Sequence, residues 1–165
     1  MVPQVMDEET KAFLADIEQR RGGQISFKTF STFYADNSGK LCLYGVFFYK
    51  VNDTYWFQDF EYVPSFLGFR LPARKDQVYV MFESSFVPGD VVSIRKVRKK
   101  AVIRCAQNGG DFTRIRTFNR VLGILSESAT ELKLNDGRLL YFQFMDDTVR
   151  NMIERKKNIN DKEGD

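Results

Sequence analysis

The sequence predicts a mostly β domain with one helix at each end. Between Gln24 and Phe144, long runs rich in Phe, Tyr, Val and Ile alternate with short turn segments, a pattern typical of antiparallel strands. Helical spacing of apolar residues is confined to the two ends of the chain. The 165 residues are 43% hydrophobic, with sixteen Phe and seven Tyr, and show no internal repeat. This composition is sufficient for one core, so we expect a single β domain.

Turn segments such as Asp36-Asn37-Ser38-Gly39 and Asn135-Asp136-Gly137 divide the β region into about seven expected strands. These cover residues 25–35, 41–51, 54–63, 77–84, 91–105, 114–126 and 131–145, the last folded back at its Asn-Asp-Gly turn. Segment 41–51 is apolar on both faces, which predicts a central strand or one covered on both sides. In segment 91–105, Lys99 and Lys100 are expected to mark a bend between two shorter strands.

The first expected helix covers residues 7–20, with Asp7 as its cap and an apolar stripe of Phe13, Leu14 and Ile17. The second runs from Asp146 to about residue 157 and places its apolar residues at helical spacing; they are Val149, Met152 and Ile153. We therefore expect an N-terminal helical extension (1–23), a β domain (24–157) and a polar, disordered tail (158–165).

The order of the expected elements, a set of antiparallel strands that ends in a hairpin and is followed by one amphipathic helix, resembles the pleckstrin-homology-like superfold, including its GRAM and bacterial branches. The resemblance is carried by the hairpin from Leu132 to Phe144, by the helix that follows it, and by the stretch from Gly45 to Phe60. It implies a seven-stranded antiparallel barrel or bent sheet, capped by the C-terminal helix with its apolar stripe in the core. Phosphoinositide-binding members carry basic residues around their first loop. Here that loop, 36–40, has a single lysine, so phosphoinositide binding of the usual type is not expected. Many other members of the superfold bind proteins instead.

Positive charge is concentrated between Arg95 and Arg120. This window holds nine basic residues and one acidic residue, Asp111, in a chain whose net charge is only +3. Such a surplus predicts one surface that contacts an anionic partner. The candidate residues for this surface are Arg95, Lys96, Arg98, Lys99, Lys100, Arg114, Arg116 and Arg120, acting through charge-assisted contacts. The competing interpretation is a solvated strand edge whose lysines prevent edge-to-edge aggregation.

The partner is left open among several anionic classes. The sequence favours a protein, and an acidic membrane surface is an alternative. Arg70 with Arg74 and Arg116 with Arg120 each fit the RxxxR half of the pattern of PilZ domains, which bind a cyclic dinucleotide. The second half of that pattern is missing, so a small nucleotide remains a further alternative. Phe112 and Phe118 lie within the basic window, which leaves single-stranded nucleic acid as the last alternative.

A loop rich in aromatic residues gives a second candidate surface. Pro64 and Gly68 interrupt the strand pattern, so Phe66, Leu67 and Phe69 could form an exposed hydrophobic contact. The other interpretation is a loop that folds over one mouth of the barrel and buries these rings. The second interpretation is favoured because large apolar patches are rare on monomers.

The composition argues against an enzyme. Histidine is absent, which removes the commonest general base and the commonest transition-metal ligand. The chain has no glycine-rich phosphate loop, so we expect a non-enzymatic protein without metal or cofactor. The N-terminus lacks the pattern of a signal peptide, and no uncharged apolar run approaches the roughly 20 residues of a membrane span. A cytoplasmic protein with two free thiols, Cys42 and Cys105, is expected.

Overall fold

The structure, a computed structural model, describes residues 8–39, 41–59, 65–66, 69–70, 80–117, 127–144, 149, 151 and 153. Its helices are α1 (Glu8–Arg21) and α2 (Lys99–Gln107), with short 3-10 turns η1 (Pro88–Asp90) and η2 (Phe112–Arg114). The strands are β1 (Ile25–Asp36), β2 (Leu41–Val51), β3 (Thr54–Asp59), β4 (Ser65–Phe66), β5 (Phe69–Arg70), β6 (Glu83–Phe86), β7 (Val91–Arg98), β8 (Ser128–Leu134) and β9 (Leu139–Phe144).

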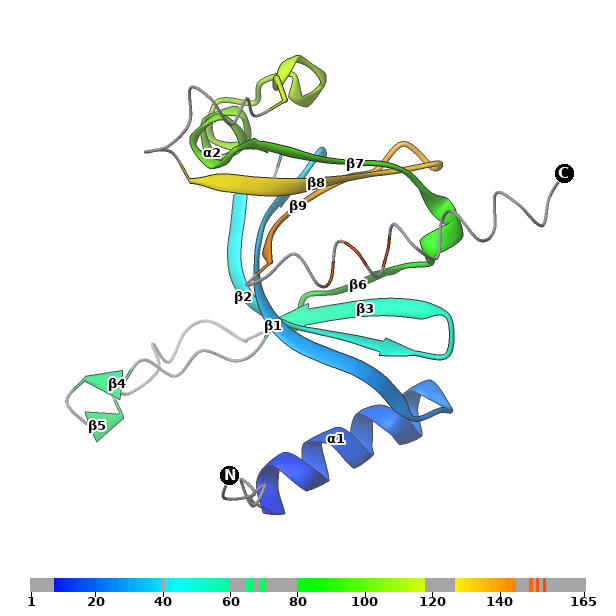
Figure 1. The fold of residues 1–165 in the computed structure, drawn as a ribbon. Coiled ribbons are helices and arrows are strands. Elements are labelled where there is room, and N and C mark those ends of the chain that lie inside the picture. Colours follow the sequence, from blue (N-terminus) through cyan, green and yellow to red (C-terminus); the bar gives the residue numbers. More distant parts are fainter. Residues whose placement is uncertain are drawn as a thin grey trace, which may run out of the picture.

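Seven of the described strands form one antiparallel sheet in the order β6-β3-β2-β1-β9-β8-β7 (Figure 1). The strands β4 and β5 pair only with each other. Two meanders make the large sheet, one from the N-terminal half of the chain and one from the C-terminal half. They join where β1 pairs with β9, with Phe33 opposite Phe142. The fold class expected from the sequence, mostly β with flanking helices, is confirmed.

The large sheet is strongly curved because its two edge strands are consecutive in the chain. Only residues 87–90 separate β6 from β7, and five Cα steps span at most about 18 Å. The side chain of Arg138, from the turn between β8 and β9, reaches across and donates to the Ser85 carbonyl oxygen at 3.1 Å. Asn135 donates its backbone N–H to the Asp90 carbonyl oxygen at 2.8 Å. The first bond joins the β8–β9 turn to the edge strand β6, and the second joins the end of β8 to the residue before the edge strand β7.

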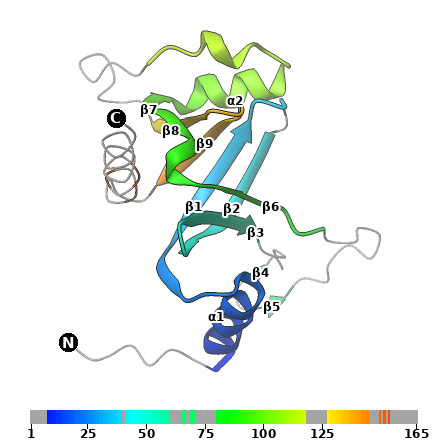
Figure 2. The same cartoon turned by 90° about the vertical axis from the view of Figure 1, so that its right-hand side faces the viewer.

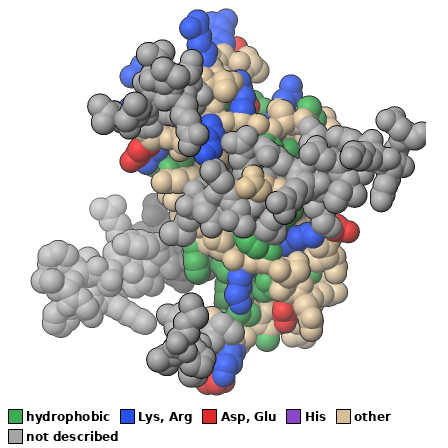
Figure 3. Space-filling view, in the orientation of Figure 1, with side chains coloured by type: hydrophobic (Ala, Val, Ile, Leu, Met, Phe, Trp, Pro, Cys, Tyr) green, Lys and Arg blue, Asp and Glu red, His purple; other side chains and the backbone are tan. Residues whose placement is uncertain are grey.

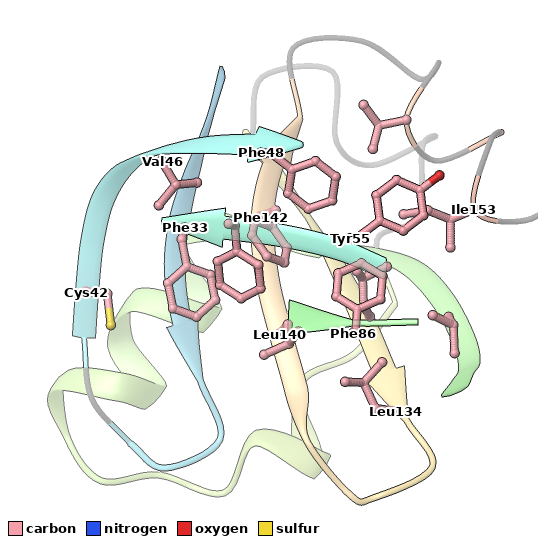
Figure 4. Packing of buried hydrophobic residues seen from close by; sticks show 14 residues of the cluster. Phe33, Cys42, Val46, Phe48, Tyr55, Phe86, Leu134, Leu140, Phe142 and Ile153 are labelled. Carbon is pink, nitrogen blue, oxygen red and sulfur yellow. The ribbon is translucent and has the colours of Figure 1, made fainter. Parts of the chain in front are cut away.

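The concave face of the sheet is filled mainly by aromatic rings (Figure 4). Phe57 and Phe142 meet edge to face with ring centroids 4.9 Å apart, and Phe33 packs on both at 5.1 Å. Val149 and Ile153, from the segment after β9, are fully enclosed in this cluster. Their burial confirms that these two residues belong to the core, as their helical spacing predicted. Asp146 and Met152 lie outside the described residues.

The convex face is covered by two helices at opposite ends (Figures 1 and 2). Ile17 of α1 is completely buried against Phe47, Tyr49 and Val51 of β2. Val102 and Ala106 of α2 are buried against Tyr34, Ala35, Val97, Ala129 and Tyr141 on the C-terminal half of the sheet. The central strand β2 therefore has apolar neighbours on both faces, as predicted from its sequence.

Three expected strands need correction. Residues 99–105 were expected to continue a strand, but they form α2 because Val102 and Ala106 are buried one helical turn apart. Residues 114–117 were expected to begin a strand. Arg114 instead ends the turn η2, residues 115–117 follow it, and Thr117 makes a single bridge to Val97. The strand expected at 77–84 lies at 83–86 in the described residues. None of the described helices is long and apolar enough to cross a membrane.

Candidate anion-binding site

Helix α2 places part of the basic window at one end of the molecule. Its buried positions, Val102 and Ala106, leave Lys100 and Arg104 on the exposed side. The helix ends at Asn108-Gly109, where Gly109 adopts a left-handed φ of 61°. The next residue, Gly110, donates its N–H to the Cys105 carbonyl oxygen at 2.8 Å. A Cβ at Gly110 would lie 3.0 Å from the Cys105 Sγ, so glycine allows the chain to turn back closely along the helix.

The returning segment, residues 111–117, is fixed by two apolar anchors. Phe112 is buried and stacks on Tyr141 with ring centroids 5.5 Å apart, and Ile115 is buried beside it. Asp111 caps the turn η2 by accepting hydrogen bonds from the Thr113 N–H at 2.9 Å and its hydroxyl at 2.6 Å. Because Ile115 is buried, its neighbours Arg114 and Arg116 remain exposed.

A hollow of about 810 Å³ lies between α2 and this returning segment. Its charged rim is made by Arg98, Arg104, Arg114, Arg116 and Asp111. Ala101, Cys105 and Ile115 contribute apolar atoms to the same hollow, and Asn108 and Thr117 contribute polar ones. In Figure 3, Lys and Arg side chains gather at the end of the molecule where Figure 1 places α2. We call this feature the arginine hollow.

A smaller hollow of about 370 Å³ adjoins the arginine hollow along α2. The two share Arg98, Ala101 and Arg104, and the smaller one adds Lys100 and Glu127. Arg98 and Arg104 therefore stand between two depressions in the surface. The side chains of Arg98 and Arg104 can therefore reach a ligand in either hollow.

Most of the basic residues around the hollows lack an ion pair with any described residue. Four of them, Arg98, Lys100, Arg104 and Arg116, are exposed and form no ion pair with any described residue. Arg114 pairs with Asp111 at 3.2 Å, but its side chain is 86% exposed. An exposed pair of this kind is weak and is easily exchanged for another anion.

Arg95, in contrast, forms an ion pair with a buried residue of the protein. Its guanidinium contacts both carboxylate oxygens of Glu131, at 2.5 and 2.8 Å, across the β7–β8 register. Glu131 is only 2% exposed and also accepts a hydrogen bond from the Tyr141 hydroxyl at 2.9 Å. The hydrogen bond to Glu131 raises the pKa of Arg95, and burial raises the pKa of Tyr141 well above its ordinary range. Arg95 therefore stabilises a buried carboxylate.

Lys99 is also engaged within the molecule. Its ammonium pairs with Glu127 at 2.5 Å and lies 5.3 Å from the centroid of the Tyr34 ring. The hydrogen bond to Glu127 raises the pKa of Lys99, and the same bond lowers the pKa of Glu127. Lys96 is partly buried on β7 opposite Thr130. The expected surface is thus divided between cations that hold the fold and cations that face solvent.

The remaining candidates are only partly covered by the described residues. Arg120, Arg74 and Leu67 lie outside them. The backbone of Phe66 and Phe69 forms the hairpin of β4 and β5, but their side chains lie outside the description, as does that of Arg70. Whether the aromatic loop forms a contact surface stays a prediction.

Arg104 is a residue of the hollow that the candidate set missed. Arg104 lies in the basic window of the sequence, but the surface predicted from the sequence does not include it. In a strand, positions 98, 100 and 104 alternate to one face, whereas here Arg98 ends β7 and Arg104 belongs to a helix. The Asn108-Gly109-Gly110 run was a signal for a helix end that could have shown the helix from sequence.

Chemically, the arginine hollow combines positive charge with an uncharged wall. Burial raises the pKa of the Cys105 thiol, so this side chain is neutral at ordinary pH and adds to the apolar lining. Hydrogen bonds from Thr113 lower the pKa of Asp111, which keeps this carboxylate ionised. Counted over the described lining residues, four arginines and one aspartate give three net positive charges. Such a site suits a ligand with several negative charges.

No group of three or more potential metal-binding side chains occurs within the described part of the chain. Cys42 and Cys105 are both free thiols, as predicted. Comparison of the chain with family models, with curated proteins and with solved structures gave no match.

Proposed function

We propose that this protein is a non-enzymatic binding module that recognises an anionic partner through the basic face around α2. The observation that carries the proposal is the set of exposed cations that lack an ion pair with any described residue, gathered at one end of the sheet; they are Arg98, Lys100, Arg104 and Arg116. Unpaired charges of one sign in a small area raise the local potential and attract an oppositely charged partner. Arg114 adds to this set because its partner Asp111 is exposed.

The proposed surface is narrower than the one expected from sequence. Arg95 and Lys99 are assigned to the fold because Glu131 and Glu127 neutralise them. A partner that recruited Arg95 would have to leave the carboxylate of Glu131 buried without its cation, which costs several kcal/mol (roughly 3–5). Both residues still contribute to the long-range field of this end.

The resemblance to the pleckstrin-homology-like superfold belongs to the proposal as well. Three features support it: an antiparallel sheet of seven strands made from two meanders, a curvature that brings β6 and β7 together, and core residues contributed from beyond the last strand. Under this resemblance the domain is a rigid scaffold whose surface determines what it binds. The α2 face lies on the convex side, away from the core cluster of Val149 and Ile153.

A salt-elution experiment tests the function. The protein is applied to immobilised polyglutamate and eluted with a salt gradient, alongside a variant with Ala at positions 98, 100, 104 and 116. A matched control variant carries Ala at four exposed basic positions elsewhere, which are Lys11, Arg20, Lys28 and Lys133. Both variants lose four positive charges, so only the placement of charge differs between them.

We expect the α2 variant to elute well before the wild-type protein and the control variant to elute close to it. Elution of the two variants at the same salt concentration would mean that net charge alone governs binding. That outcome would sink the proposal that the α2 face is the binding surface.

A further inference from the structure

The arginine hollow carries an inference about the chemistry of the partner, and this inference rests on the proposed function. We propose that the hollow binds a small organic phosphate in which phosphate groups are joined to a flat ring, as they are in nucleotides. The shape of the site, the residue type of its cations and the nature of its wall all favour such a ligand.

The shape favours a compact ligand. The hollow is an open depression of about 810 Å³, and small-molecule sites usually have volumes of roughly 300–1,000 Å³. Its walls come from α2 and from the returning segment, which the buried anchors Phe112 and Ile115 hold in place. A flat protein or membrane surface would contact the rim and leave the interior of the hollow unfilled.

Among the residues that the structure describes, the cations that line the hollow are arginines. A guanidinium group donates two parallel N–H bonds to a phosphate, and its planar face can stack on a ring. Arg98 and Arg104 approach from the β7–α2 side, while Arg114 and Arg116 approach from the returning segment. Cations from two opposite walls favour a ligand held between them over one that lies along a single edge.

The wall between these arginines is uncharged. Ala101 and Ile115 offer apolar atoms, and the neutral thiol of Cys105 lies beside them. A simple inorganic anion would leave this wall in contact with water. A ligand with a ring can cover the wall while its phosphates reach the arginines, so both kinds of surface are used at once.

A binding assay with nucleotides tests the inference. Isothermal titration calorimetry would compare ADP and ATP with pyrophosphate, which has the phosphates but lacks a ring. We expect the nucleotides to bind roughly tenfold more tightly than pyrophosphate, because stacking and wall contacts are lost without the ring. An Arg98→Ala, Arg104→Ala double variant should lose about tenfold or more in nucleotide affinity.

A second variant separates the hollow from the general basic face. Asn108 is exposed and lines the hollow, so Asn108→Trp fills the space without changing any charge. We expect this variant to lose nucleotide binding while its elution from polyglutamate remains that of the wild type. Its melting temperature, and that of the double variant, would confirm that both remain folded.

The outcomes distinguish the two proposals. If the protein binds polyglutamate through the α2 arginines but binds nucleotides no better than pyrophosphate, the ligand inference is overturned and the proposed function stands. Nucleotide binding that survives Asn108→Trp overturns the hollow as the site. Binding to anionic lipid vesicles in preference to soluble nucleotides assigns the face to a membrane and overturns the inference as well. If neither polyglutamate nor nucleotide binding depends on the arginines, both proposals fail.

Discussion

The helices α1 and α2 cover the convex face of the same sheet, but the arginines beside them differ in burial and pairing. Arg21 of α1 is partly buried and paired, whereas Arg98 and Arg104 near α2 are exposed. At the end of α1, the Arg21 guanidinium lies 3.7 Å above the Trp56 ring and donates to the Tyr49 hydroxyl at 3.2 Å. It also pairs with Glu83 of β6, and its side chain is only 14% exposed. Around α2, Arg98 and Arg104 face solvent beside two hollows.

This difference shows that the number of arginines in a segment does not reveal their role. Arg21 holds α1 against β3 and β6, so its charge is already neutralised in the folded protein. The α2 arginines contribute little to holding the fold and keep their charge available. Substitutions that remove cations of each kind should therefore affect stability and binding separately.

The largest effect is expected at Glu131, the buried carboxylate beneath the basic face. Glu131→Ala should lower the free energy of unfolding by about 3 kcal/mol, because Arg95 and Tyr141 lose their shared acceptor. The value lies at the low end for a broken buried pair, since Arg95 keeps some access to water. Urea unfolding monitored by tryptophan fluorescence would measure it. An unchanged midpoint would show that the pair does not stabilise the fold.

The next largest effect on stability is expected at Arg21 of α1, and its neighbour Arg20 serves as the control. Arg21→Ala should lower the free energy of unfolding by about 2 kcal/mol, because it removes a contact with Trp56 and leaves Glu83 without its cation. Arg20→Ala is the matched control, since Arg20 makes only an exposed pair with Asp16 at 2.8 Å. It should cost about 0.5 kcal/mol or less. Equal losses in thermal melts of the two variants would contradict the assigned difference.

A smaller effect is expected from alkaline pH. Burial raises the pKa of Tyr141 above its ordinary value of 10.0, so the neutral phenol is favoured in the folded state. The resulting stability is complete below pH 10 and is lost as pH rises toward the folded pKa, by about 1.4 kcal/mol per pH unit for one such group. Unfolding midpoints measured at several alkaline pH values should decline more steeply in the wild type than in Tyr141→Phe.

The smallest effect on stability is expected at the α2 face. Arg104→Ala should change the free energy of unfolding by less than about 0.5 kcal/mol, because its side chain is exposed and has no ion pair with a described residue. Its binding to polyglutamate should nevertheless weaken. A loss of stability like that of Arg21→Ala would place Arg104 among the cations that hold the fold.

The sequence predicted much of the sheet because its signals are local. Strands β1, β2 and β9 coincide with apolar runs bounded by clear turn residues, and Gly22 ends α1 with a left-handed φ of 66°. The helix α2 was missed because Ala101-Val102-Ile103 contains β-branched residues that are common in strands. Here the burial of Val102 and Ala106 against the sheet determines the outcome.

The described arginines that line the hollow lie in the basic window of the sequence, but their arrangement could not be read from it. Pairing depends on register, however, and the position of Arg95 opposite Glu131 follows from how β7 aligns with β8. No local pattern contains that alignment. The hollow likewise depends on a close approach of Gly110 to α2, which is a tertiary contact.

The junction of β1 with β9 has a consequence for how the chain folds. The Ser31 hydroxyl donates to the carbonyl oxygen of Gln143, which lies 112 residues further along the chain. Contacts this distant in sequence slow folding, because a long loop must close before they form. During synthesis β1, β2 and β3 emerge well before β9. Phe33 and Phe57 therefore cannot pack against Phe142 until the end of the chain has been made. Until then the half-built sheet presents an unpaired edge and an uncovered apolar face, which makes the nascent chain most prone to aggregation before its last strand is made.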